Sequence, residues 1–306
     1  MAREQWGICA EANLHGLHLF FNAHDGYEPV IREALTQLPK IFEEINEQFS
    51  EAMFSAVIAI GASFWDDLYP DKKPEGLKPF SAIKHDDRYM PGESIDLFVQ
   101  LRSDRQDVNY IACQRLVSLF GEMIELIEQV PCFRYLDGRD LTGFVDGTEN
   151  PKGRNRRDVA LVKHGTFASG SYLHVQRYRH NLARWDKVPT EEQELIIGRT
   201  KIDDIEMSKE DMPDTSHVKH ASLKDENGNS LELMRQSMPY GNASIQGLLF
   251  ISYCAQPTNF ERILHNMVFG SGEGNYDHML DYTTAETGSA FFAPSIDFLK
   301  NQGNIG

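Results

Sequence analysis

Residues 143–151 read Gly-Phe-Val-Asp-Gly-Thr-Glu-Asn-Pro, a run with little freedom to form a regular helix or strand. It places one carboxylate, Asp146, between valine and glycine. Glycine allows a positive φ and close approach of the backbone to a ligand, and the residue before a proline is kept out of the helical region. The run therefore predicts a tight turn that holds Asp146 rigidly at a cavity wall. The alternative is an ordinary Asp-Gly turn with a solvated side chain.

Hydrophobic periodicity on either side of this run predicts alternating strands and helices. Before it, we expect strands over 14–21, 54–60, 95–101 and 133–136, and helices over 31–45 and 108–127. After it, we expect strands over 171–178, 230–235, 247–253 and 289–292, and helices over 191–199 and 259–268.

The order β-α-β-β-α-β in the first half is typical of a ferredoxin-like unit, and the second half repeats it loosely. We therefore predict an α+β fold of two ferredoxin-like domains with antiparallel sheets, residues 1–140 and 141–306. The segment 137–157 joins them and contains the opening run, so a cleft is expected there.

Charge argues against two classes of partner. The 306-residue chain carries 30 Lys and Arg against 46 Asp and Glu, a formal net charge of −16. Binding to nucleic acid depends mainly on basic side chains that neutralise phosphates, so we expect no nucleic acid partner, and no anionic membrane surface either. The first residues have no signal pattern, and no apolar run is long enough to span a bilayer, so we expect a cytoplasmic protein.

Two further side chains have suggestive settings. His217 lies in a polar, proline-punctuated loop, where most histidines are simply solvated. Arg235 ends an apolar segment. A buried guanidinium without a partner is very unfavourable, so Arg235 must reach solvent or meet an anionic or polar group.

Four segments of the chain resemble the signature segments of the dye-decolorising peroxidases. They are the opening run at 143–151, Ser-His-Val at 216–218, Leu-Met-Arg-x-x-Met-Pro-Tyr-Gly at 233–241 and Thr-Gly-Ser-Ala-Phe-Phe-Ala-Pro-Ser at 287–295. The resemblance covers both halves and is closest to the compact type-B branch. It implies a haem enzyme with two ferredoxin-like domains of the dimeric α+β barrel type.

The resemblance also implies roles for particular residues. His217 would be the ligand of a haem b iron, and its other ring nitrogen would donate to Asp277, with Asp281 as the second choice. On the opposite face of the haem, Asp146 would take a proton from hydrogen peroxide and return it to the leaving oxygen. Arg235 would stabilise the charge that develops there.

Other positions are open to two interpretations. Asn150, with the basic run at 152–157, would lie near the haem propionates, although charge runs are more often solvated. Phe250 would either line the haem pocket or pack in the core. Ser237 stands where some type-B members carry asparagine. The four scattered cysteines include no haem-attachment motif, so haem would be held without covalent links.

The implied reaction reduces hydrogen peroxide and oxidises dyes, phenols or other small aromatic one-electron donors through a ferryl intermediate. An ordinary aspartate has a pKa of about 3.9, so a solvated Asp146 would favour activity at acidic pH. We also expect a homo-oligomer, since ferredoxin-like sheets often pair.

Three alternatives are open at this point. The chain could be a haem carrier or an enzyme that removes iron from haem, with incidental peroxidase activity. It could be a stress-compartment cargo protein, or a binding module of the same fold that holds no haem.

Overall fold

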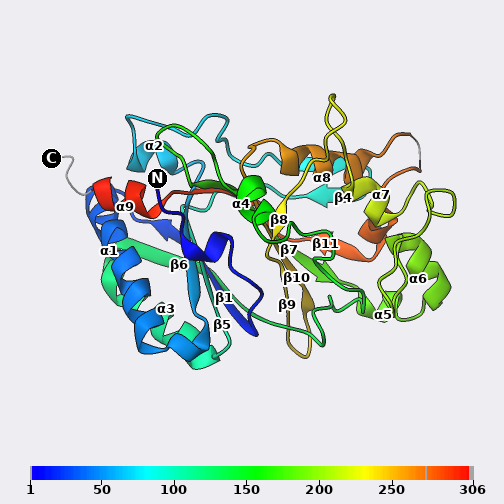
Figure 1. Ribbon diagram of the computed structural model, residues 1–306, viewed down its shortest axis with the longest axis horizontal. Coiled ribbons are helices and arrows are strands. Elements are labelled where there is room, and N and C mark those ends of the chain that lie inside the picture. Colours follow the sequence, from blue (N-terminus) through cyan, green and yellow to red (C-terminus); the bar gives the residue numbers. More distant parts are fainter. Residues whose placement is uncertain (1, 273, 303–306) are drawn as a thin grey trace.

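The computed structural model describes residues 2–272 and 274–302 (Figure 1). The strands are β1 His15–Ala23, β2 Ser55–Gly61, β3 Ile83–His85, β4 Arg88–Met90, β5 Leu97–Ser103, β6 Ile124–Phe133, β7 Ser171–His180, β8 Met234–Arg235, β9 Met238–Gly241, β10 Gln246–Cys254, β11 Thr283–Ala285 and β12 Ser289–Ala293. The α-helices are α1 Glu28–Gln48, α2 Trp65–Leu68, α3 Gln106–Phe120, α4 Asn155–Ala160, α5 Leu182–Trp185, α6 Thr190–Ile197, α7 His217–Ala221, α8 Asn259–Phe269 and α9 Ile296–Asn301. Short 3₁₀ helices cover Trp6–Ile8, Ser50–Ala52, Gly121–Met123 and His278–Asp281.

The main sheet closes on itself. The first half contributes strands in the spatial order β2-β5-β1-β6, and the second half contributes β9-β10-β7-β12. β12 pairs with β2, and β6 pairs with β9, so these eight strands form a closed barrel. The pairings among the described strands are antiparallel, which confirms the prediction of a mixed α/β fold with antiparallel sheets.

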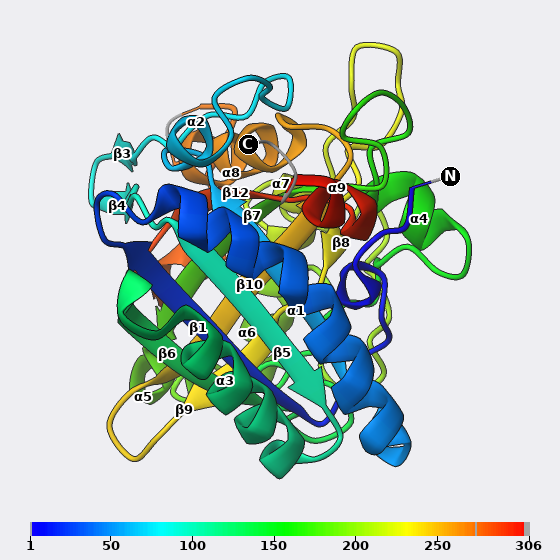
Figure 2. The ribbon, with the colours of Figure 1, turned by 90° about the vertical axis from the view of Figure 1, so that its left-hand side faces the viewer.

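Strand alternation separates two apolar regions. In β1, Leu19 and Phe21 point outward into the core that α1 and α3 cover, whereas Phe20 points into the barrel interior. Figure 2 shows α1 and α3 lying across the outer face of β1 and β5. In the second half, α7 packs against α8 (Figure 1). The barrel interior is thus shared by both halves, while each half has its own helices.

The structure corrects three of the sequence-based boundaries. The predicted helix over 108–127 is wrong in its last turns, because Gly121 takes a φ of +51° and ends α3. The chain then forms β6, which pairs with β1 along its length, so the fourth strand precedes the predicted 133–136.

The predicted strand over 230–235 is wrong except for its last two residues. Ser230 pairs instead with Lys224 across a local turn. The short strand β9 was not predicted, since Pro239 lies within it and proline lowers the expectation of a strand. None of the helices in the described ranges is long and apolar enough to cross a membrane.

The seam between the halves gives a test of the packing. Gly61 ends β2 and pairs with Phe291 of β12. A Cβ atom added there would lie 1.9 Å from the Ile95 carbonyl oxygen. We expect Gly61→Ala to lower the free energy of unfolding by about 1–3 kcal/mol, since backbone atoms must move apart. Urea unfolding of the variant beside Gly272→Ala, where an added Cβ meets nothing within 4 Å, measures this. Equal stabilities of the two variants would contradict it.

Candidate active site

The run at 143–151 forms the predicted tight turn. Gly143 and Gly147 have φ values of +90° and +85°, which other residues rarely adopt. The Asp146 amide donates to the Gly138 carbonyl oxygen at 3.1 Å, and the Asn150 amide donates to that of Gly147 at 3.0 Å. The backbone on both sides of Asp146 is therefore fixed by hydrogen bonds, as the glycine and proline pattern predicted.

Asp146 and Arg235 line the same cavity, with a volume of about 470 Å³. It lies at one mouth of the barrel, where β5 and β6 end and β9 begins. Ser237 is also in its wall, and its hydroxyl accepts a hydrogen bond from the Ile251 amide at 3.3 Å. The structure thus brings together residues from the opening run and from the segment 233–241, some 90 positions apart, at the expected junction of the two halves.

Asn150 holds the backbone of Arg235 by two hydrogen bonds. Its side-chain nitrogen donates to the Arg235 carbonyl oxygen at 2.8 Å, and its side-chain oxygen accepts from the Arg235 amide at 2.9 Å. The amide group of Asn150 therefore ties the turn to β8 directly. A role beside a haem propionate stays a prediction.

The carboxyl group of Asp146 is half-buried rather than solvated. Burial raises its pKa above the ordinary value, and the negative charge of Asp140 adds to this. The positive charges of Arg235 and, to a smaller extent, His217 lower the pKa of Asp146, but the net shift is upward. Asp146 is therefore a weaker acid than a free aspartate, and it lies within electrostatic reach of both cationic groups.

His217 begins α7 and is paired with a carboxylate. Its Nδ1 lies 2.7 Å from Oδ2 of Asp277, whose side chain is fully buried. The other oxygen of Asp277 accepts from the Met279 amide at 2.9 Å, which fixes the carboxylate. Asp281, the second choice, instead accepts a hydrogen bond from the Tyr276 hydroxyl at 2.9 Å.

The Asp277 partner controls the charge of His217. Burial by itself lowers the pKa of His217, but the charge and hydrogen bond of Asp277 outweigh burial, so the pKa is raised. The imidazole is 31% exposed, and no hydrogen bond in the described part of the chain uses its Nε2. One ring nitrogen is thus oriented by a fixed carboxylate, and the other is available to a ligand.

Phe250 is not among the residues that line this cavity, and it lies on the face of β10 that points away from the barrel interior. Its neighbours Leu249 and Ile251 point into the barrel interior, whereas Phe250 packs on Phe260 of α8, with ring centroids 5.8 Å apart. It therefore faces the side of the sheet where α7 and α8 lie. Its place in a haem pocket stays a prediction.

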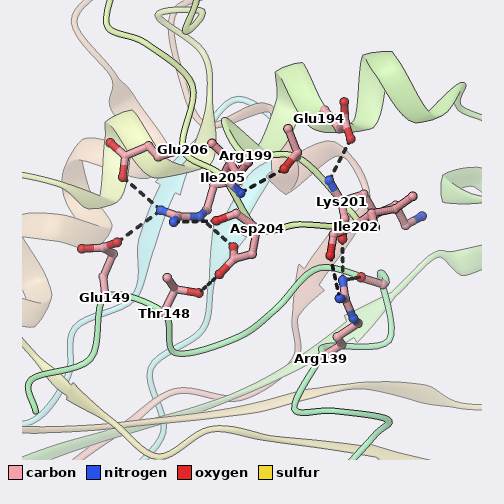
Figure 3. Close-up of polar contacts among 12 residues, drawn as sticks. Arg139, Thr148, Glu149, Glu194, Arg199, Lys201, Ile202, Asp204, Ile205 and Glu206 are labelled. Carbon is pink, nitrogen blue, oxygen red and sulfur yellow. Dashed lines mark hydrogen bonds and ion pairs between the residues drawn. The ribbon is translucent and has the colours of Figure 1, made fainter.

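A polar clamp, which the sequence did not reveal, fastens the turn to the loop after α6 (Figure 3). Nε of Arg199 lies 2.8 Å from a carboxylate oxygen of Asp204, and Nη1 pairs with Glu149 at 3.2 Å and Glu206 at 3.0 Å. The Thr148 hydroxyl donates to Asp204. Thr148 and Glu149 follow Asp146 closely, so this clamp restrains the turn from its second side.

The clamp should stabilise the folded protein. Arg199 is 11% exposed and serves three carboxylates, so Arg199→Met leaves like charges beside one another with no cation. We expect a loss of about 2 kcal/mol in the free energy of unfolding. Urea unfolding checks this against Arg115→Met, which removes one exposed arginine that pairs only with Glu44 among the described residues. An equal effect of the two substitutions would show that the clamp is not stabilising.

Both halves of the chain are similar to known proteins. Residues 8–134 match the N-terminal part, and residues 137–298 the C-terminal part, of Dyp-type peroxidases. The dye-decolorizing peroxidase of Rhodococcus erythropolis is 35% identical over 289 residues, which cover 93% of this chain and 85% of that protein. A deferrochelatase of Yersinia pestis is 37% identical over 70 residues, only 20% of this chain and 16% of that protein.

Solved structures agree with the match along the whole chain. The crystal structure of a candidate dyp-type peroxidase from Shewanella oneidensis is 52% identical, covers 98% of both chains and has a TM-score of 0.96. A variant of DypB from Rhodococcus jostii RHA1 in complex with haem is 32% identical, covers 98% of this chain and 100% of that chain, and has a TM-score of 0.94. The chain belongs to the Dyp-type peroxidase family.

Proposed function

We propose that this protein is a haem-dependent peroxidase that reduces hydrogen peroxide and oxidises dyes, phenols or similar one-electron donors. The observation that carries the proposal is the arrangement of two pairs of side chains, His217 with Asp277 and Asp146 with Arg235, in a chain that belongs to this family. Asp277 orients His217, and Asp146 and Arg235 line one cavity within electrostatic reach of His217. The cofactor is haem, and the iron is the haem iron.

The residues present fit a haem group. An iron ligand must offer a nitrogen lone pair, and the Nε2 atom of His217 is free of other described partners while Nδ1 is held by Asp277. In His-ligated haem proteins, an acid on the second ring nitrogen fixes the ring and increases the electron density that the ligand donates. We assign His217 as the iron ligand and Asp277 as the residue that orients it.

Asp146 and Arg235 are assigned to peroxide. When bound, the haem supplies the electrons that break the O–O bond. Asp146, held by the turn, takes a proton from hydrogen peroxide and delivers it to the oxygen that leaves as water. Arg235, held through its backbone by Asn150, provides positive charge beside that oxygen. Ser237 lines the same space with a shorter polar side chain than asparagine.

The division of the chain into two ferredoxin-like domains is part of the same proposal. Numbered by their order within each half, the four barrel strands have the spatial order 2-3-1-4 in both halves, which supports two ferredoxin-like domains, residues 1–140 and 141–306. A cytoplasmic location and a homo-oligomer follow the sequence-based expectations.

The second candidate function is haem handling, as carrier or as an enzyme that removes iron. The short match to a deferrochelatase favours it only over 20% of the chain. This function needs His217 but not a competent Asp146 and Arg235 pair, so substitutions of that pair separate the two candidates.

The third prediction tests the peroxide reaction. Mixing the haem-loaded protein with hydrogen peroxide in a stopped-flow instrument should change the Soret spectrum rapidly. Asp146→Asn should slow the change by about 10²-fold or more because the proton acceptor is lost, and Arg235→Leu by about 10²–10³-fold because the stabilising charge is lost. Asp71→Asn and Arg115→Leu remove the same charges from exposed positions and should react like the wild type. A wild type no faster than free haem would favour haem handling.

The fourth prediction concerns pH. Asp146 acts as a base when deprotonated, so the rate of the peroxide reaction should fall as the pH is lowered through its pKa. Because burial raises this pKa, the fall should begin at a higher pH than a free aspartate would give. Oxidation of dyes is therefore expected in mild acid, as long as the pH is above the pKa of Asp146.

Two variants should shift the midpoint of this fall in rate at low pH in opposite directions. Arg235→Leu removes the charge that lowers the pKa of Asp146 and should move the midpoint to higher pH. Asp140→Asn removes a charge that raises the pKa and should move the midpoint to lower pH. The pH profile of the second-order rate constant measures both, and an identical midpoint in all three proteins would exclude Asp146 as the titrating group.

A further inference from the structure

We propose that the mouth of the barrel beside Asp146 and Arg235 binds a small oxyanion, a carboxylate or a phosphate, between the guanidinium groups of Arg102 and Arg156. The inference rests on the proposed function, since the ligand would occupy the cavity that these two residues line. It adds a chemical class of ligand and the residues that recognise it.

The cavity is positively charged in a strongly negative protein. The chain has a net charge of −16, yet the acidic side chains in the cavity wall are Glu11, Asp137 and Asp146. Against these three carboxylates, the wall carries six cationic side chains: Arg102, Arg134, Arg139, Lys152, Arg156 and Arg235.

Four of these six cations have no carboxylate partner among the described residues. Asp137 pairs with Arg139, and Glu11 pairs with Arg156. In the described ranges, no carboxylate lies within ion-pair distance of the other four cations, Arg102, Arg134, Lys152 and Arg235. The excess charge therefore faces the cavity without neutralisation by the protein.

Arg102 is the strongest sign of a missing ligand. It lies at the end of β5 with an exposed fraction of 3%, and it points toward the barrel interior like Phe98 and Gln100. Its Nη1 donates to the side-chain oxygen of Gln236, and its Nη2 donates to the Glu11 carbonyl oxygen at 3.1 Å. Its Nε has no partner in the described part of the structure. A buried guanidinium without a counter-charge is unfavourable, and so is a buried N–H group without an acceptor.

Arg156, which also lines the cavity, repeats this feature. Its side chain is 11% exposed, and its Nε is likewise buried without a described acceptor. Burial lowers the pKa of Arg102 to about 10, and the charge of Arg156 adds to this lowering, so the two guanidinium groups repel each other. An oxyanion in the cavity between them would offset the repulsion between their two positive charges.

The geometry of the donors selects an oxyanion. A guanidinium edge matches the spacing of the oxygen atoms of carboxylates and phosphates. The cavity of about 470 Å³ has room for a small organic acid or phosphate. This chemistry has two possible sources: a free small molecule, such as a carboxylate-bearing reductant, or the propionate groups of the haem itself.

The experiment is calorimetric titration of inorganic phosphate into the haem-loaded protein and into the haem-free chain. Binding to both forms, with an unchanged Soret band, identifies a free oxyanion as the ligand. Binding only to the haem-free chain, with the native circular dichroism spectrum retained, supports the site and assigns the propionates to it. Absence of binding in both forms overturns the proposal.

Matched variants locate the site. Arg156→Gln and Lys152→Gln each remove one positive charge from the wall and should weaken binding about tenfold and severalfold, respectively. Glu11→Gln removes the exposed carboxylate beside Arg156 and should tighten binding. Arg115→Gln removes one positive charge elsewhere and should leave the dissociation constant unchanged. Equal affinities in all these variants would show that phosphate binds outside the cavity.

The readout separates this inference from the proposed function. Phosphate binding is measured without peroxide, so it can be present in a protein with no peroxidase activity. A protein that reacts rapidly with peroxide but binds no phosphate would overturn the oxyanion site alone.

Discussion

The two hydrogen bonds between Asn150 and the backbone of Arg235 join the parts of the site that the chain supplies from distant segments. The turn at 143–151 could hold Asp146 rigidly by itself, but it could not place that carboxylate relative to β8. A side-chain amide that uses both its oxygen and its nitrogen on one residue fixes distance and orientation together. The backbone that carries Arg235 is consequently fixed relative to the turn that carries Asp146, and preorganisation of this kind is what electrostatic assistance to a reaction requires.

The sequence predicted well what depends on local backbone chemistry. The glycines at 143 and 147 required positive φ values, and the structure has them. The mixed fold with antiparallel strands followed from periodicity. The end of the helix at Gly121 was missed because Met123 and Ile127 continue an apolar pattern at helical spacing, although Ile127 is exposed in β6. Periodicity alone cannot tell a helix from a strand over so few residues.

The resemblance paired His217 with Asp277, and the structure has this contact, but most other contacts between distant residues were beyond the sequence. Nothing near Asn150 indicates that its partner is 85 positions away, and the clamp of Arg199 on Asp204 and Glu149 joins two loops with no shared motif. The choice between Asp277 and Asp281 was also open, because both lie in one polar segment. Burial decided it: Asp277 is fully enclosed beside His217, whereas Asp281 is occupied by Tyr276. These positions depend on packing, which a single sequence does not record.

Gln236 explains why the site needs both halves of the chain. It follows Arg235 and lies in the barrel interior, where its side-chain nitrogen donates to the carbonyl oxygens of Gly7 and Ile8 at 2.9 and 2.6 Å. Its side-chain oxygen accepts from Gln100 and Arg102. All four partners belong to the first half.

The chain at β8 is therefore held from both halves of the protein. Arg235, the last residue of β8, is fixed to the turn of the second half. Gln236, the residue after it, is fixed to the N-terminal segment and to β5 of the first half. A shift between the halves would break buried hydrogen bonds of Gln236, each of which would leave a polar group without a partner. Closure of the barrel therefore does more than bury apolar surface, because it fixes the position of the arginine that the proposed reaction uses.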